Sequence, residues 1–120
     1  MSQQPAQQPQ QDRRHQRYEL QQPIPVIDQQ TGASMGALVN ITIEGLMVMA
    51  NSELESNRLY QLALQLPEPV NGFSSIELGV DCLWSRGDEQ VQRYWAGFQI
   101  IDASQEAIKV IEALIRTGEQ

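Results

Sequence analysis

The sequence has very few of the residues from which disulfides and metal sites are made. Its 120 residues include one cysteine, Cys82, and one histidine, His15. A single cysteine cannot form a disulfide within the chain, and a zinc site would have to combine Cys82 and His15 with carboxylates. We therefore expect no structural metal and no cofactor, and the lone cysteine fits a reducing cytoplasm.

Long apolar runs are also missing. No stretch approaches the roughly 18 apolar residues that a membrane-spanning helix requires, and no apolar segment follows the N-terminal residues as it does in an export signal. The length of 120 residues suits one compact domain that buries its own core. We expect a single cytoplasmic domain without membrane insertion.

The groupings of residues that carry catalysis are absent too. His15 stands between arginines, which disfavour its protonated form and offer no nearby nucleophile. The sequence contains no Ser, His and Asp set, no glycine-rich phosphate loop and no Cys and His pair that could act together. The many carboxylates are typical of a solvated surface. The sequence therefore predicts a binding protein without catalytic residues, not an enzyme.

Positive charge is scarce and gathered in one place. The net charge is -7, yet the short stretch RRHQR holds Arg13, Arg14 and Arg17. Residues 18–120 carry five basic against fourteen acidic residues. Such a body repels DNA and RNA, which bind along broad basic stripes. The arginine cluster is either a solvated charged run or the part of a site that binds a small anion.

The first eleven residues differ in composition from the rest of the chain. The stretch MSQQPAQQPQQ has six glutamines, two prolines and no charged side chain. Such a segment has too little apolar surface to offset the entropy that ordering would cost. We expect residues 1–11 to form a disordered tail, which residues 12–17 join to the folded part.

From residue 18 onward, short extended runs alternate with turn residues. The run 58–66 has one apolar face and one mixed face. The run 74–84 places five residues on one face: Ile76, Leu78, Val80, Cys82 and Trp84. This alternation predicts that Trp84 lies in the core. In the returning run 91–101 the same alternation turns Trp95 outward, where another element covers it or a ligand stacks on it.

The last segment changes to a helical period. Apolar residues recur at helical spacing at Ala107, Ile108, Ile111, Leu114 and Ile115. Asp102 can cap the helix together with Gln105, and Gly118 follows at its end. We therefore assign residues 18–102 to strands and residues 103–117 to one helix. Five or six antiparallel strands with one terminal helix predict a mainly β fold, a small barrel against which the helix packs.

A second polar motif lies between two apolar strands. The stretch NITIEG places Asn40 and Thr42 two residues apart and Gly45 three residues later. An amide and a hydroxyl then share one side of a strand, and the glycine lets the backbone turn sharply. The motif is either an ordinary hairpin or part of a binding site. Its separation of 22 residues from RRHQR is short enough for one hairpin to bring the two together.

The two motifs together resemble the signature of a known family. Arg13-x-x-x-Arg17 followed by Asn40-x-Thr42-x-x-Gly45 is similar to the RxxxR and (D/N)xSxxG pair of PilZ domains, which bind the bacterial second messenger cyclic di-GMP. The run after the glycine, the VDCLW and WAGFQI strands and the terminal helix also resemble parts of a PilZ domain. The resemblance covers residues 12–117 and implies a six-stranded antiparallel β-barrel with a C-terminal α-helix packed against it.

The resemblance implies that the arginines bind the ligand. Cyclic di-GMP carries two phosphates and two guanines. The planar fork of arginine can take two phosphate oxygens or the O6 and N7 atoms of guanine. Arg13 and Arg17 occupy the motif positions, and Arg14 is the expected third contact.

The second motif would complete the site. By the resemblance, Asn40 lies near the Watson–Crick edge of a guanine or orients an arginine, Thr42 adds a hydroxyl, and Gly45 allows close approach. Thr42 stands where the family more often has serine, and its extra methyl group stiffens the side chain. Asn40 replaces the commoner aspartate and removes a charge that could pair with arginine. We expect binding, with an affinity that these two changes can lower.

The resemblance also implies a mode of action. The protein would be a bacterial receptor for cyclic di-GMP that signals to a separate, unidentified effector protein in the regulation of motility or biofilm formation. The phosphates would draw the arginine segment onto the barrel and order it, creating a surface for the effector. Two alternatives remain at this stage: a PilZ-like adaptor that binds no nucleotide and acts by protein contact, or a basic tail that touches anionic lipid.

Overall fold

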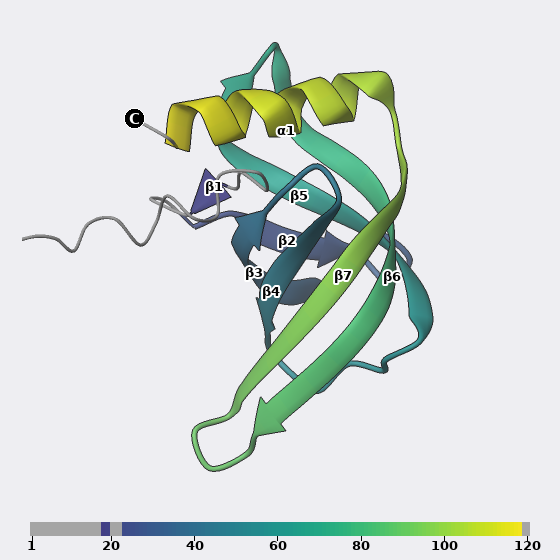
Figure 1. Cartoon of the computed structure of the whole chain (residues 1–120). Coiled ribbons are helices and arrows are strands. Elements are labelled where there is room, and N and C mark those ends of the chain that lie inside the picture. Colours follow the sequence, from purple (N-terminus) through teal and green to yellow (C-terminus); the bar gives the residue numbers. More distant parts are fainter. Residues whose placement is uncertain (1–17, 20–22, 119–120) are drawn as a thin grey trace, which may run out of the picture.

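The computed structural model of the protein describes Tyr18–Glu19 and residues 23–118 (Figure 1). The strands are β1 (Tyr18–Glu19), β2 (Pro25–Asp28), β3 (Ser34–Ile41), β4 (Gly45–Ala50), β5 (Arg58–Val70), β6 (Phe73–Asp88) and β7 (Arg93–Ala103), and the helix α1 spans Gln105–Gly118. The predicted tail and arginine segment, residues 1–17, lie outside the described residues. No helix in the part of the chain that the structure describes is long and apolar enough to cross a lipid bilayer.

Six strands close into an antiparallel barrel. Hydrogen-bonded neighbours follow the order β2, β5, β6, β7, β4 and β3, and β3 pairs with β2 to complete the circle. Closure gives each strand a partner on both sides in the middle of the barrel. The short strand β1 pairs with the end of β3, where Tyr18 lies opposite Ile41 and Glu19 opposite Asn40. The predicted six-stranded barrel with one C-terminal helix is confirmed.

The core follows the alternation of the strands. In β5 the buried side chains are Tyr60, Leu62, Leu64 and Leu66, and in β6 they are Ile76, Leu78, Val80 and Cys82. Because successive strand residues face opposite sides, one apolar face in each strand is enough to fill a barrel. The predicted inward faces of β5 and of β6 as far as Cys82 are confirmed.

The helix α1 closes one end of the barrel, at the top of Figure 1. Its buried side chains are Ala107, Val110, Ile111, Leu114 and Ile115. The Oγ atom of Ser104 accepts a hydrogen bond of 3.0 Å from the backbone N–H of Ala107, so Ser104 is the N-cap. The prediction of Asp102 as the cap is wrong, because Asp102 still belongs to β7 and pairs with Gly79 of β6.

Trp84 lies on the outside of the barrel and its side chain is 38% exposed. In the pairing of β6 with β7, Cys82 lies opposite Phe98 but Trp84 lies opposite Gly97, so Leu83 is an extra residue in β6. Such a bulge reverses the alternation of the residues that follow it. The prediction of a core Trp84 assumed an unbroken strand and is wrong.

The strands β6 and β7 continue beyond the end of β5 as a hairpin, seen at the bottom of Figure 1. The partner strand β5 ends its pairing with β6 at Cys82, and β4 ends its pairing with β7 at Tyr94. Glycines in β6 and β7 make room for rings here: a side chain at Gly87 would collide with the ring of Tyr94, and one at Gly97 with the indole of Trp84.

Candidate functional site

Three predicted site residues, Asn40, Thr42 and Gly45, lie together at the β3–β4 hairpin. Asn40 is half-buried near the end of β3. The backbone N–H of Thr42 donates a hydrogen bond of 2.8 Å to the carbonyl oxygen of Gly45, which closes the turn. Ile43 and Glu44 at its tip are exposed. The structure therefore brings all three motif residues to one tight hairpin.

The hydroxyl of Thr42 shapes this turn. Its Oγ1 atom accepts hydrogen bonds of 3.1 Å from the backbone N–H groups of both Glu44 and Gly45. Serine and threonine hydroxyls stabilise turns in this way, and either residue can make the two contacts. The hydroxyl thus has a structural role in the hairpin, while its contact with a ligand stays a prediction.

Gly45 is required by the neighbouring strand. A side chain at this position would collide with the carbonyl oxygen of Phe98 in β7. A hydrogen bond of 2.8 Å from the backbone N–H of Ile100 to the carbonyl oxygen of Glu44 fixes the hairpin to the same strand. The close approach that this glycine permits is between β4 and β7. A close approach to a ligand stays a prediction.

Asn40 belongs to a row of residues that crosses the outside of the barrel. It lies opposite Met47 of β4, Met47 lies opposite Gly97 of β7, and Gly97 lies opposite Trp84 of β6. The indole ring of Trp84 covers Gly97. One exposed aromatic ring and one amide therefore lie on the same surface.

Two β-bulges create this row. In β3, Leu38 and Ile41 both point into the core, which leaves Val39 as an extra residue and turns Asn40 outward. In β6 the extra residue is Leu83. Bulges redirect side chains and are common next to functional sites. Without them, neither Asn40 nor Trp84 would face outward at this level of the barrel.

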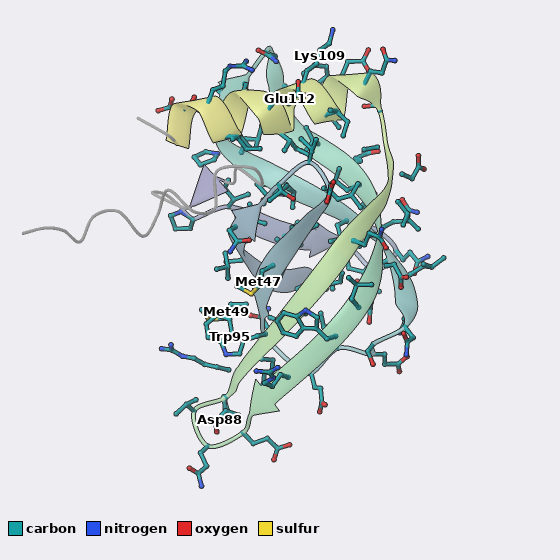
Figure 2. The ribbon with its side chains drawn as sticks, viewed as in Figure 1. Met47, Met49, Asp88, Trp95, Lys109 and Glu112 are labelled. Atoms are coloured by element: carbon teal, nitrogen blue, oxygen red, sulfur yellow. The ribbon has the colours of Figure 1, made fainter. Side chains whose placement is uncertain are left out.

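A second row runs beside the first. Met49 of β4 lies opposite Trp95 of β7, and Trp95 lies opposite Arg86 of β6. Figure 2 shows Met47, Met49 and Trp95 on one side of the barrel. The predicted outward direction of Trp95 agrees with this register, and its side chain is half-buried. The members of the two rows, which we call the outer face, are Asn40, Met47, Met49, Trp84, Arg86 and Trp95.

Arg86 adds a cation to the outer face. Its guanidinium carbon lies 5.6 Å from the centre of the Trp84 ring, a distance at which a cation is attracted to an aromatic face. The only ion pair within 4.0 Å among the described residues joins Arg58 to Glu55, so Arg86 has no carboxylate partner there. The outer face thus combines an amide, two indoles, two thioethers and one guanidinium.

The predicted arginines Arg13, Arg14 and Arg17 lie outside the described residues. Their point of attachment is described, because Tyr18 is bonded to Arg17 and lies opposite Ile41, one residue before Thr42. The structure therefore places Tyr18, the residue that follows the arginine segment in the sequence, beside the last residue of β3.

Cys82 lies beneath the outer face and is buried. Burial raises the pKa of its thiol above the ordinary value of 9.0, and Asp81 adds to the rise, whereas a backbone hydrogen bond with Trp84 opposes it. Among residues 18–19 and 23–118 there is no group of three or more His, Cys, Asp or Glu side chains that could hold a metal ion.

Sequence reasoning missed Trp84 and Arg86 as members of this surface. The signal that could have found them is Gly97, which stands among larger residues in β7. A glycine inside a strand often marks the close approach of another group. Here that group is the indole of Trp84.

The fold and the site define a small closed β-barrel that has a terminal helix and a recognition surface on its outside. The family model described as PilZ domain matches residues 11–117. The chain therefore belongs to the PilZ domain family. A comparison with curated proteins finds no match for it.

Solved structures of PilZ proteins share this fold. The inhibitor of motility MotI (DgrA) from Bacillus subtilis superposes with a TM-score of 0.66 and 17% identity, over 86% of this chain and 49% of MotI. YcgR from Escherichia coli in complex with cyclic di-GMP superposes with a TM-score of 0.68 and 11% identity, over 88% of this chain and 45% of YcgR. The PilZ domain of YcgR from Escherichia coli with cyclic di-GMP superposes with a TM-score of 0.63 and 11% identity, over 88% of this chain and 90% of that domain. The chain thus spans about half the length of MotI and of YcgR.

Proposed function

We propose that the protein is a receptor for cyclic di-GMP, which it binds between the arginine segment and the β3–β4 hairpin. The observation that carries the proposal is the pairing of β1 with the end of β3, in which Tyr18, the residue after Arg17 in the sequence, lies opposite Ile41. Membership in the PilZ family and the likeness to YcgR, solved with cyclic di-GMP, support the choice of ligand. The protein has no catalytic role in this proposal.

Each part of the ligand finds a chemical partner in the proposed site. The two phosphates pair with Arg13, Arg14 and Arg17, whose forked guanidinium groups form paired hydrogen bonds with phosphate oxygens. The amide of Asn40 hydrogen-bonds a guanine edge or orients one of these arginines. Elsewhere the chain is acidic, which restricts anion binding to this end of the barrel.

The outer face adds a place for a guanine ring. Gly97 lies on β7, and β4 separates β7 from β3, the strand that carries Asn40. The indole of Trp84 covers Gly97 and is therefore about two strand spacings, roughly 10 Å, from β3. Stacking of a base on an aromatic ring contributes about 1–3 kcal/mol. Arg86 beside the ring can reach a phosphate of the same ligand. We therefore include Trp84 and Arg86 in the proposed site.

The signal passes to another protein in this proposal. Ordering of the arginine segment next to β1 changes the surface of β1 and of the two elements that β1 contacts, β3 and α1. A separate effector protein, in a pathway that regulates motility or biofilm formation, recognises the changed surface. The likeness to MotI, an inhibitor of motility, supports this kind of output.

A PilZ-like adaptor that binds no nucleotide is the second candidate. The observation that favours it is that Thr42 and Gly45 both have structural roles in the hairpin, so their presence does not require a ligand. In this case the barrel would act only through protein contact.

Isothermal titration calorimetry with cyclic di-GMP separates the two candidates. The receptor binds cyclic di-GMP but neither GMP nor cyclic di-AMP, and Arg13→Ala/Arg17→Ala abolishes the binding because the phosphate partners are lost. Arg58→Ala/Lys109→Ala is the matched control: it also removes two cations, both exposed and outside the β3–β4 hairpin and the outer face, and leaves binding unchanged. Absence of binding at saturating ligand, with a folded protein, would contradict the receptor and favour the adaptor.

A further inference from the structure

The strand β6 has an unpaired edge at the end of the barrel where α1 lies. Its pairing with β7 includes Leu78 opposite Ala103 but none of Phe73–Glu77, which pair with β5 on their other side only. Among the described residues, no backbone hydrogen bond from a turn, loop or cap reaches this stretch. In an antiparallel strand, alternate N–H and C=O groups point to each side. Those that point away from β5 have no strand partner here.

This edge borders a cleft of about 500 Å³. The opposite wall is formed by the end of β7 and the first turn of α1, including Asp102, Ser104 and Ala107. Figure 1 shows β7 turning into α1 at the same end of the barrel as the β5–β6 turn. The cleft exists because β7 leaves the sheet while β6 continues. Its volume lies within the range of about 300–1,000 Å³ that is usual for ligand sites.

The neighbouring edge of β5 is protected, whereas the edge of β6 is not. β5 extends past its last pairing with β2, at Leu64, and carries Pro67 and Pro69 in this extension. Proline has no N–H group, so an edge with prolines cannot recruit another strand efficiently. The edge of β6 has no proline and presents Phe73, whose side chain is 40% exposed. Of the two edges at this end, only that of β6 is open to strand addition.

The charges around the cleft select the kind of segment that can bind. Three of the residues that line it carry carboxylates, namely Glu77, Asp102 and Glu106, and none of the lining residues is lysine or arginine. An open strand edge provides backbone hydrogen bonds to an extended peptide, and charge complementarity then favours one that carries cations.

We propose that this cleft binds an extended basic segment of a partner protein, which adds as a strand to the edge of β6. The backbone of the segment pairs with Phe73–Glu77. Its lysine or arginine side chains face Glu77, Asp102 and Glu106. The cleft shares no residue with the outer face or the β3–β4 hairpin. The proposal is therefore independent of nucleotide binding.

The test uses the full ¹⁵N-labelled protein without nucleotide and three synthetic peptides of one length. The first alternates lysine or arginine with valine, the second is the same peptide methylated on alternate backbone nitrogens, and the third has glutamate in place of each basic residue. The first peptide shifts the NMR signals of residues 73–79 and 102–107 and slows amide exchange within 73–77. The other two bind at least about tenfold more weakly, because strand hydrogen bonds or charge pairs are lost.

Charge reversal on the protein gives the complementary result. Glu77→Lys/Glu106→Lys weakens binding of the basic peptide at least about tenfold. The matched control, Glu68→Lys/Glu112→Lys, changes two exposed carboxylates outside the cleft and leaves binding unchanged. Figure 2 shows Glu112 on α1. Circular dichroism of both variants verifies that they are folded.

Three results would overturn the proposal. The first is that the basic peptide causes no shifts at the cleft at millimolar concentration, and the second is that all three peptides bind equally well. Alternatively, sedimentation reveals a dimer of the protein alone that Glu77→Lys/Glu106→Lys dissociates, in which case the occupant is a second copy of this chain.

Discussion

Two aromatic residues on adjacent strands, Phe98 and Trp84, differ in what they stabilise. Phe98 is 3% exposed, and its ring meets that of Tyr60 edge to face with 6.0 Å between the ring centres. Trp84 is 38% exposed and covers Gly97 from outside. Burial of a side chain, more than its size, sets its contribution to stability. The stability of the barrel should therefore depend on Phe98 far more than on Trp84.

Alanine substitution tests this difference. Phe98→Ala removes a core ring and should lower the free energy of unfolding by about 3–5 kcal/mol. Trp84→Ala removes a partly exposed ring and should lower it by about 1 kcal/mol. Urea denaturation of the two variants, followed by circular dichroism, measures both values. Equal losses would mean that Trp84 belongs to the core.

Cys82 links stability to alkaline pH. Burial raises the pKa of its thiol above 9.0, so the folded protein keeps a proton that the unfolded chain releases. Below pH 9.0 both states are protonated and this contribution is fully present. As the pH rises above 9.0, the unfolded state alone loses the proton and folding becomes less favourable.

The expected consequence is a steeper loss of stability for the natural protein than for Cys82→Ala. As the pH rises above 9.0, the free energy of unfolding of the natural protein should fall faster than that of Cys82→Ala, because only the natural protein carries the thiol. Urea denaturation across the alkaline range measures it. Parallel pH profiles of the two proteins would show that the thiol has the same pKa in both states.

At the scale of elements, the β3–β4 hairpin depends on one hydroxyl. The Oγ1 atom of Thr42 is the acceptor for two backbone N–H groups of the turn. Thr42→Val keeps the shape of the side chain but removes this acceptor, and should lower the free energy of unfolding by about 1–2 kcal/mol. Thr42→Ser is the matched control that keeps the hydroxyl and should cost less. Urea denaturation without nucleotide compares them; equal stability of Thr42→Val and the natural protein would contradict the structural role.

Most elements could be predicted from the sequence because their alternation is regular. The inward faces of β5 and of β6 up to Cys82 follow a strict period of two, and α1 follows a helical period. The bulges at Val39 and Leu83 could not be predicted, since valine and leucine are ordinary strand residues and a bulge depends on the partner strand. The helix cap was misplaced because the pairing of Asp102 with β6 is likewise a property of the sheet.

Some residues of the candidate site could likewise be predicted from the sequence, and others could not. The spacing of Asn40, Thr42 and Gly45 was sufficient to predict that they lie together, because they are close in the sequence. Trp84 and Arg86 join them only through the pairing of β4 with β7 and of β7 with β6. Contacts of this kind depend on register, which the alternation of a single strand does not determine.

The whole molecule presents two surfaces with different chemistry. The β3–β4 hairpin and the outer face carry one guanidinium, an amide and two indoles, the groups of the proposed nucleotide site. At the free edge of β6, carboxylates and an unpaired strand suit a basic peptide. Between them lies a closed barrel with one continuous core.

An NMR titration of the full ¹⁵N-labelled protein with cyclic di-GMP tests the central claim most directly. We expect shifts of the amide signals of Asn40, Gly45 and Gly97 and of the indole N–H of Trp84. Slower amide exchange over residues 12–17 should accompany them, and cyclic di-AMP should cause neither change. If cyclic di-GMP leaves these signals and the exchange of residues 12–17 unchanged, or shifts only signals elsewhere on the barrel, the proposed receptor site is wrong.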